Sequence, residues 1–221
     1  MNAKDWYNNQ YQEMFRSGQT SLRPIRWYSD MLKLLIGKRP ILGSLLDVGC
    51  GLGELVELAN SKGIESWGID ISDTAIEKAE LQRKFSGSHR FQVSPAEHLT
   101  FPDNSFNYIA CLGSLEHFEN MHQALDEMKR VAKPYCRFLI IVPNKKFPLA
   151  GTEQQEIKEA LLTKELWQII IHANGFNIIK IRKDYGLAYK LGKLAWLGKL
   201  LFWLLPLDYT YQFVLEMERY K

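Results

Sequence analysis

Three glycines and two acidic residues fall where neighbouring strands of a parallel sheet would end. Gly49, Gly51 and Gly53 follow a short apolar run. Asp47 lies within that run, and Asp70 ends the next apolar run about 20 residues after the glycines. Glycine has no Cβ, so such a loop lets backbone N–H groups approach a ligand closely. A carboxylate beside the loop offers two acceptor oxygens, which match the two hydroxyl donors of a ribose.

The spacing of the glycines distinguishes two kinds of nucleotide-binding loop. The dinucleotide fingerprint G-x-G-x-x-G would need its third glycine at position 54, where this chain carries Glu54. The chain has G-x-G-x-G instead, and its stretch D-V-G-C-G-L-G resembles motif I of the class I S-adenosylmethionine-dependent methyltransferases, similar to the ubiquinone and menaquinone biosynthesis group. A nicotinamide-dependent oxidoreductase is the rival that Glu54 argues against.

The resemblance implies roles for the two acids. Asp70 would bind both ribose hydroxyls of S-adenosylmethionine, and Asp47 would organise the loop and approach the methionine ammonium group. The alternatives are a helix cap for Asp70, which Ser72 or Asp73 could provide alone, and a turn cap for Asp47. The cofactor-binding residues that the resemblance implies are Asp47, Gly49, Cys50, Gly51, Gly53, Asp70, Ile71, Ala96, Glu97 and Leu112.

The segment 91–106 resembles the stretch of this family in which G-D-A-E precedes L-P-F-x-D-x-S-F-D and binds adenine. In this chain Pro95 replaces the acid that accepts from the adenine amino group. The backbone N–H of Ala96 is retained, so we expect adenine recognition to survive in part, with Glu97 as the residue that could compensate. Asn107 replaces the usual Asp that follows.

His117 is the candidate catalytic residue. It follows the fourth expected strand, at the sheet end where ligands bind in such folds. Methyl transfer depends mainly on positioning, and a base is needed only when the acceptor must lose a proton. An imidazole with an ordinary pKa of about 6.5 suits that role, and packing under the cofactor is the alternative. Glu116 and His117 also resemble the end of a metal-binding E-x-x-E-H pattern, but Gly113 replaces its first acid, so we expect no metal site.

Apolar runs and helical periodicities alternate from residue 44 onward, which predicts an α/β protein. The expected strands are 45–48, 66–69, 90–93, 106–111, 136–142, 176–183 and 209–219. The expected helices are 5–15, 24–36, 53–61, 73–84, 119–132 and 163–173. These elements match a doubly wound, seven-stranded, mostly parallel sheet of the Rossmann-like methyltransferase type, and the resemblance implies that its last strand is antiparallel.

We expect a single methyltransferase domain over residues 1–221. It would comprise a helical N-terminal extension (1–43), a cofactor-binding core (44–145) and a substrate-side region (146–221). The aromatic-rich extension would either cover the cofactor or pack on the sheet edge. The polar loop formed by residues 143–147 and 151–156 would contact a hydroxylated substrate, begin a helix capped by Thr152, or do both.

Residues 187–206 form an apolar helical insertion before the last strand. Its leucines and aromatics surround the helical wheel, and its three lysines and two glycines exclude a comfortable membrane span. The sequence leaves open what buries these apolar side chains: the N-terminal helices, a homodimer partner or an acyl-bearing substrate. Peripheral contact with a membrane or lipid is the further alternative.

The composition limits the partners and the compartment. A net charge of +3 over 221 residues is too small to indicate a nucleic-acid partner. The three cysteines form no C-x-x-C pair and the N-terminus carries no apolar signal core, so we expect a protein of the reducing cytoplasm.

These features predict an S-adenosylmethionine-dependent methyltransferase that acts on an oxygen or nitrogen atom of a small molecule and releases S-adenosylhomocysteine. The sequence leaves three kinds of small-molecule acceptor open: a saccharide or glycolipid head group, a quinone-like ring, or a natural product. The alternative is a regulatory or scaffold protein that binds S-adenosylmethionine without transferase activity, which Pro95 and Asn107 favour slightly.

Overall fold

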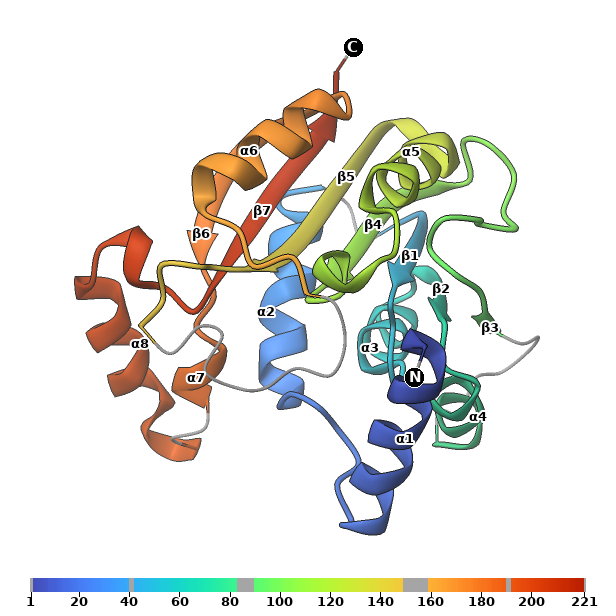
Figure 1. Cartoon of the computed structure of the whole chain (residues 1–221), viewed down its shortest axis with the longest axis horizontal. Coiled ribbons are helices and arrows are strands. Elements are labelled where there is room, and N and C mark those ends of the chain that lie inside the picture. The colour runs from blue at the N-terminus through green and yellow to red at the C-terminus, as the bar shows by residue number, and fades with distance from the viewer. Residues whose placement is uncertain (1, 40–41, 83–89, 149–158, 190–191, 221) are drawn as a thin grey trace.

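The computed structural model describes residues 2–39, 42–82, 90–148, 159–189 and 192–220 (Figure 1). Its strands are β1 (Ser44–Val48), β2 (Glu65–Asp70), β3 (Phe91–Val93), β4 (Phe106–Leu112), β5 (Ala132–Pro143), β6 (Phe176–Lys183) and β7 (Gln212–Arg219). Its α-helices are α1 (Ala3–Arg16), α2 (Ile25–Ile36), α3 (Glu54–Ser61), α4 (Asp73–Gln82), α5 (Met121–Val131), α6 (Lys164–Ala173), α7 (Gly186–Tyr189) and α8 (Ala195–Leu204). Short 3₁₀ turns cover η1 (Leu115–His117), η2 (Gly192–Leu194) and η3 (Leu207–Tyr209).

The seven strands form one sheet in the order β3-β2-β1-β4-β5-β7-β6. β7 runs antiparallel to both β5 and β6, and the pairs from β3 to β5 are parallel. The predicted mostly parallel sheet with an antiparallel last strand is therefore confirmed. The chain order reverses between β1 and β4, and open α/β sheets bind ligands at the carboxyl ends of the strands beside such a reversal.

Helices cover both faces of the sheet, as the predicted doubly wound fold requires (Figure 1). Side chains of α5 and α6 pack with Leu46 and Ile109 in one core cluster. Side chains of α2 and α3 pack with Leu45 and Tyr108 in a second cluster. Consecutive strand residues thus enter opposite cores, which is why the central strands read as nearly continuous apolar runs.

The starts of two strands differ from the sequence prediction by three residues or more. The helix expected over 119–132 ends at Val131, and the chain enters β5 at once, so Pro134 lies inside the strand instead of ending the helix. A register shift accompanies this start, because Phe106 pairs with Ala132 and the next pair follows at Tyr108. The strand expected from 209 begins at Gln212, because η3 occupies the residues after Pro206.

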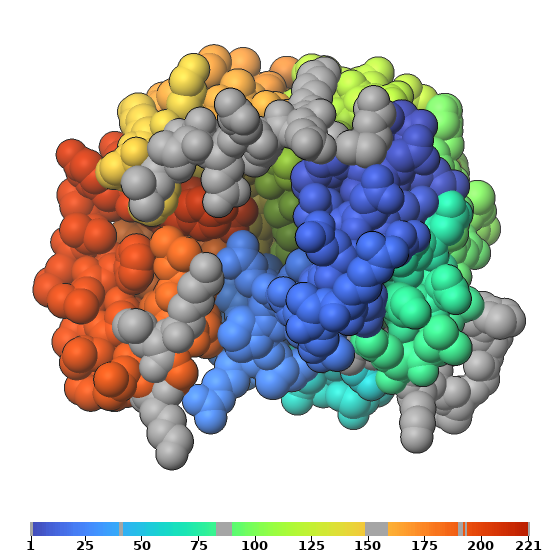
Figure 2. Space-filling view, turned by 60° about the horizontal axis from the view of Figure 1, so that its bottom comes forward, coloured from blue at the N-terminus to red at the C-terminus, as the bar shows by residue number. Residues whose placement is uncertain are grey.

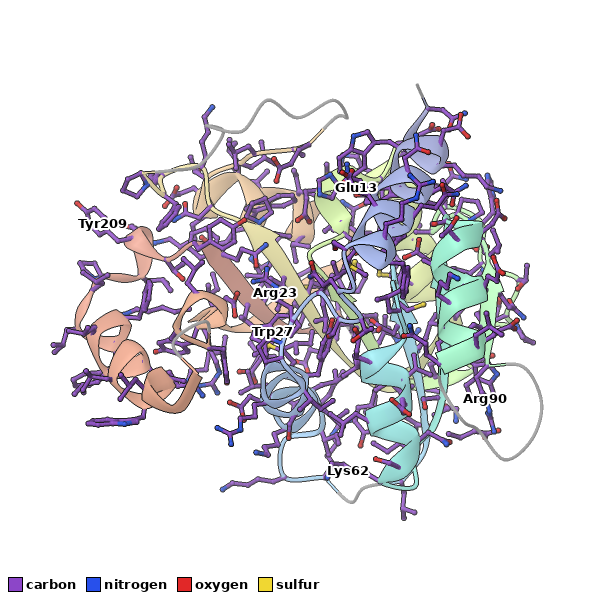
Figure 3. The ribbon with its side chains drawn as sticks, turned by 90° about the horizontal axis from the view of Figure 1, so that it is seen from below. Glu13, Arg23, Trp27, Lys62, Arg90 and Tyr209 are labelled. Carbon is purple, nitrogen blue, oxygen red and sulfur yellow. The ribbon has the colours of Figure 1, made fainter. Side chains whose placement is uncertain are left out.

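The insertion between β6 and β7 is fixed to α2 at its base. The Trp27 indole N–H donates to Asp184 Oδ1 at 2.7 Å, and the Arg23 guanidinium lies 5.4 Å from the centre of the Trp27 ring. Arg23 and Trp27 lie side by side in Figure 3, between the sheet and the insertion. Tyr189 of α7 is buried in the cluster of α2. No helix among the described residues is long and apolar enough to cross a bilayer.

Candidate functional site

The glycine loop leaves β1 and turns back against the end of β2. The backbone N–H groups of Gly49 and Cys50 each donate to the Ile69 carbonyl oxygen at 2.8 Å. Gly51 has a φ of +52°, and a Cβ added there would lie 2.8 Å from the hydroxyl oxygen of Tyr11. Both the backbone conformation and the lack of space therefore require glycine at this position.

The Asp70 carboxylate holds this loop in place. Its Oδ2 accepts from the Gly51 N–H and its Oδ1 from the Ser72 N–H, at 2.9 Å each. Burial raises the pKa of Asp70, and the backbone hydrogen bonds oppose that rise. The cap of α4 is provided by Ser72, whose Oγ accepts from the Ala75 N–H at 3.1 Å. Asp70 is therefore not needed to cap α4. Its carboxylate oxygens keep lone pairs that a ligand could use.

A second buried carboxylate lies beside it. Asp47 is 3% exposed, and its Oδ1 accepts no hydrogen bond among the described residues. Burial, followed by the negative charges of Glu54 and Asp70, raises the pKa of Asp47 to about 8. Glu54, which in the sequence is visible only as a departure from the dinucleotide pattern, is buried and close enough for its charge to raise the pKa of Asp47. The mutual repulsion of these three buried carboxylates favours a cationic ligand at Asp47.

These groups border a cavity of about 580 Å³ at the carboxyl ends of the central strands. Of the predicted site residues, the following line it: Asp47, Gly49, Cys50, Gly51, Asp70, Ile71, Ala96, Glu97, Leu112 and His117. Gly53 does not line the cavity. It packs behind the loop, where an added Cβ would meet the Phe91 ring at 2.4 Å. The structure therefore brings together residues that the sequence spreads over four strand ends.

The region expected to hold adenine is also at this cavity. Pro95 lines it, and the Ser94 N–H donates to the Asp70 carbonyl oxygen at 3.0 Å, which fixes the segment to β2. Glu97 Oε1 accepts from the N–H of Asn120, the cap residue of α5, at 3.1 Å. Glu97 Oε1 is thus occupied by the start of α5. Its other carboxylate oxygen is available to accept a hydrogen bond from a ligand.

His117 lies at the cavity wall within a cluster of acidic groups. Glu116 is 3% exposed, and burial raises its pKa to about 8. Its Oε1 lies 4.0 Å from His117 Nε2, and potential ligand atoms of Glu116, His117 and Glu159 lie within 4.8 Å of one another. The ring of Tyr7 meets the His117 ring nearly edge-on, with centroids 6.0 Å apart. The separation of the Glu116, His117 and Glu159 atoms would suit a shared proton or a shared cation. The expectation that the protein has no metal site stays a prediction.

Helix α1 covers the cavity and is anchored to α4. Asn8 Oδ1 accepts from the Ser72 hydroxyl at 2.6 Å and from the Thr74 N–H at 3.2 Å. Lys4 and Asp73 form an ion pair at 2.8 Å. In Figure 2, α1 (dark blue) extends across this face of the molecule against the green residues of α4. Three aromatic side chains of α1 line the cavity, namely Trp6, Tyr7 and Tyr11. The second helix of the extension, α2, packs on the face of the sheet against Leu45 of β1 and Tyr108 of β4, and not on its edge. That the extension covers the cofactor stays a prediction.

The polar loop after β5 does not contribute to the cavity where it is described. Asn144 is fully buried, and its side-chain amide donates to the carbonyl oxygens of Asp208 and Thr210 at 2.9 and 2.8 Å. Its role is therefore to fix η3, which contradicts the substrate contact expected for this residue. Thr152 and the rest of Gly151–Glu156 lie outside the described residues.

Comparison with known proteins places this site in a family. The sequence profile described as "Methyltransferase domain" matches residues 46–140, from β1 into β5. O-methyltransferase rstn1 of Aspergillus nomiae is 30% identical over 65% of this chain and 70% of that protein. The uncharacterized methyltransferase YcgJ of Bacillus subtilis is 35% identical over 44% of this chain and 39% of that protein. Methyltransferases of quinone biosynthesis also match.

The fold is shared with a solved structure of distant sequence. The crystal structure of the cyclase SpnF superposes with a TM-score of 0.72 at 18% identity, over 98% of this chain and 96% of that chain. The match to O-methyltransferase rstn1, together with the methyltransferase profile, shows that the chain belongs to the S-adenosylmethionine-dependent methyltransferase family, and the nicotinamide rival is not supported. The matches to the first curated relatives span only 28–39% of their length.

Proposed function

We propose that this protein transfers a methyl group from S-adenosylmethionine to an oxygen or nitrogen atom of a small molecule and releases S-adenosylhomocysteine. The observation that carries the proposal is the Asp47 carboxylate, buried at the cavity with an oxygen that has no partner among the described residues. A buried carboxylate without a partner is costly, and a bound cation offsets that cost. S-adenosylmethionine carries both an ammonium and a sulfonium group.

The residues of the cavity fit the remaining parts of this cofactor. Asp70 offers acceptor oxygens to the two ribose hydroxyls, next to a loop whose glycines admit close approach. Ala96 and Glu97 are the proposed contacts of the adenine ring. When bound, the cofactor supplies a methyl group on an excellent leaving group, so the chain itself has mainly to position the acceptor and exclude water.

The proton of the acceptor would pass to His117. Its imidazole lines the cavity, and Glu116 Oε1 lies 4.0 Å from its Nε2. Burial raises the pKa of Glu116 to about 8, so this carboxyl is mostly protonated at neutral pH and adds little negative charge beside the imidazole. The neutral imidazole of His117 is then the proposed base. An acceptor hydroxyl is favoured by the named O-methyltransferases among the relatives.

The aromatic wall indicates the type of acceptor. Trp6, Tyr7 and Phe118 line the cavity beside His117. Such side chains provide flat apolar contact area with few polar groups, which suits an aromatic or otherwise apolar body carrying a hydroxyl or amine. We therefore propose that the acceptor contains an aromatic or otherwise apolar ring, carries the hydroxyl or amine to be methylated, and has few charged groups.

Calorimetry with S-adenosylmethionine and S-adenosylhomocysteine, followed by a mass-shift screen of hydroxylated and aminated ring compounds, tests the proposal. Binding of both nucleosides and an acceptor that gains one methyl group would support it. The alternative protein without transferase activity would bind both and methylate nothing. Asn107 no longer favours that alternative, because its Oδ1 accepts from the Ser44 N–H and Lys133 Nζ at 3.0 Å each and is structural.

A further inference from the structure

Helix α8 carries its most apolar side chains on the outside. Toward the rest of the protein it turns Gly198, which is buried, and Lys199 and Phe202, which are half-buried. The α8 surface consists of eight exposed apolar residues: Leu194, Trp196, Leu197, Leu200, Leu201, Trp203, Leu204 and Leu205. This arrangement reverses the usual one, in which the apolar stripe of a helix faces the core. A contiguous exposed patch of this kind indicates an interaction site.

Polar contacts hold α8 in this orientation. Lys199 Nζ donates to Asp30 Oδ2 at 2.9 Å and lies 4.2 Å from the centre of the Tyr189 ring. At the other end, Lys183 Nζ donates to the carbonyl oxygens of Phe202 and Trp203 at 3.0 and 2.9 Å. These carbonyls are the groups that a helix end leaves without partners. The leucines and tryptophans are thus held outward by contacts that do not bury them.

The position and the charge of the segment identify what covers it. α7 and α8 project beyond the β6–β7 edge of the sheet, far from β3 at the opposite edge (Figure 1), and Tyr209, 53% exposed, lies at the same outer end in Figure 3. Between Asp184 and Asp208 the sequence contains three lysines and no acidic residue, and because Lys199 is paired with Asp30 of α2, the segment keeps a net positive charge from the other two lysines. Tryptophan and lysine are favoured at the boundary between lipid headgroups and acyl chains, and lysine is attracted to anionic lipids.

We propose that the α8 surface docks the protein onto an anionic lipid bilayer, with the helix lying in the headgroup region. A helix of 10 residues is about 15 Å long, roughly half of the hydrocarbon thickness, so it lies on the bilayer and does not cross it. A second copy of the chain is the less suitable occupant. A two-fold interface would set this segment against its own copy, and the net positive charge that remains after Lys199 pairs with Asp30 would then be repelled by the same charge on the other copy.

Vesicle flotation tests the proposal on the full chain. The wild type is mixed with phosphatidylcholine vesicles with and without phosphatidylglycerol, beside the double variant Trp196→Gln/Trp203→Gln. The control is Ile169→Gln, because Ile169 is an apolar residue of α6 with a similar exposure of 62%, against 63% and 66% for the two tryptophans. All three proteins are also tested for S-adenosylhomocysteine affinity and for their mass in solution.

We expect the wild type and Ile169→Gln to float with the phosphatidylglycerol vesicles, and the double variant to lose binding by at least about tenfold. S-adenosylhomocysteine affinity should be equal in all three, since neither tryptophan lines the cavity. The proposal is overturned by absence of vesicle binding, by equal binding of the double variant, or by a wild-type dimer that the double variant dissociates. None of these results bears on the proposed methyl transfer, which the nucleoside affinity and the acceptor screen test separately.

Discussion

The Gly51 N–H lies 2.9 Å from Asp70 Oδ2, so the glycine loop and the end of β2 are joined through the carboxylate that would bind the ribose. Replacing Asp70 therefore removes two contributions together, the acceptor for the ligand and the support of the loop. Hydrogen bonds to a charged group contribute about 1.5–3 kcal/mol each. Asp70→Ala should thus weaken S-adenosylhomocysteine binding by a hundredfold or more, an order of magnitude set by about two such bonds.

Titration calorimetry of Asp70→Ala beside Asp103→Ala gives the comparison. Asp103 is an exposed acid whose partner is Arg130 and which lies outside the cavity, so its removal should leave affinity unchanged. Unaltered affinity of Asp70→Ala, with a normal circular dichroism spectrum, would remove the ribose assignment.

Asp47 should make ligand binding depend on pH. In the free protein its pKa is about 8, so the carboxyl is protonated at lower pH and a cationic ligand must displace that proton. The affinity for S-adenosylhomocysteine, which retains the ammonium group, should rise with pH by up to about tenfold per unit and level off above about pH 8. Asp47→Asn should bind weakly and lose most of this dependence. A pH profile of the variant that is parallel to the wild type would contradict the contact with the ammonium group.

His117→Ala should lower the turnover rate without lowering the affinity for S-adenosylmethionine or S-adenosylhomocysteine. Loss of a general base costs about 10²–10⁴-fold in rate when the acceptor must lose a proton. The matched control is His122→Ala, because His122 contacts Asn174 and does not line the cavity. Single-turnover rates with an acceptor found in the mass-shift screen provide the measurement. Full activity of His117→Ala would leave the imidazole with a packing role only.

Glu116 should lower the stability of the free protein as pH rises. Its pKa is 4.5 in an unfolded chain and about 8 in the folded state, so the folded state holds the proton over that interval. The contribution is fully present below pH 4.5 and is lost as pH rises through about 8. Urea unfolding of Glu116→Gln should therefore show a flatter pH dependence than the wild type. An equal pH dependence of the variant and the wild type would mean that the carboxyl ionises at its ordinary pKa in the folded protein.

The contact between Trp27 and Asp184 should stabilise the fold independently of the site. Trp27→Phe retains an aromatic ring but removes the indole N–H, which leaves the Asp184 carboxylate short of a donor in a buried place. Such a loss costs about 1–3 kcal/mol in the free energy of unfolding. Tyr28→Phe, a change in the neighbouring buried ring, is the comparison, and equal destabilisation of both variants would show that the hydrogen bond contributes little.

The positions of residues that are set by local sequence could be predicted. The glycine loop, Asp70 and the Ser72 cap follow from patterns a few residues long, and the order of strands and helices follows from apolar periodicity. Gly53 shows the limit of that reasoning, because the motif includes it but packing against Phe91 places it behind the loop. Its contact with β3 is not encoded within the motif itself.

Features that depend on distant contacts were not predicted. The pairing of buried Glu54 with Asp47 arises from the turn between β1 and α3, and Asn144 is structural because η3 returns to it from more than sixty residues away. The outward direction of the leucines of α8 was also invisible in the sequence, where they surround the helical wheel. Lys199 and Lys183 decide that direction through contacts with Asp30 and with the end of the helix.

A crystal structure with S-adenosylhomocysteine tests the central claim most directly. The expected result is an adenosyl group in the cavity of about 580 Å³, with both ribose hydroxyls on Asp70 and the ammonium group on Asp47. A nucleoside bound elsewhere on the protein, or a cavity that α1 side chains fill and that holds no nucleoside at saturating ligand, would contradict the account.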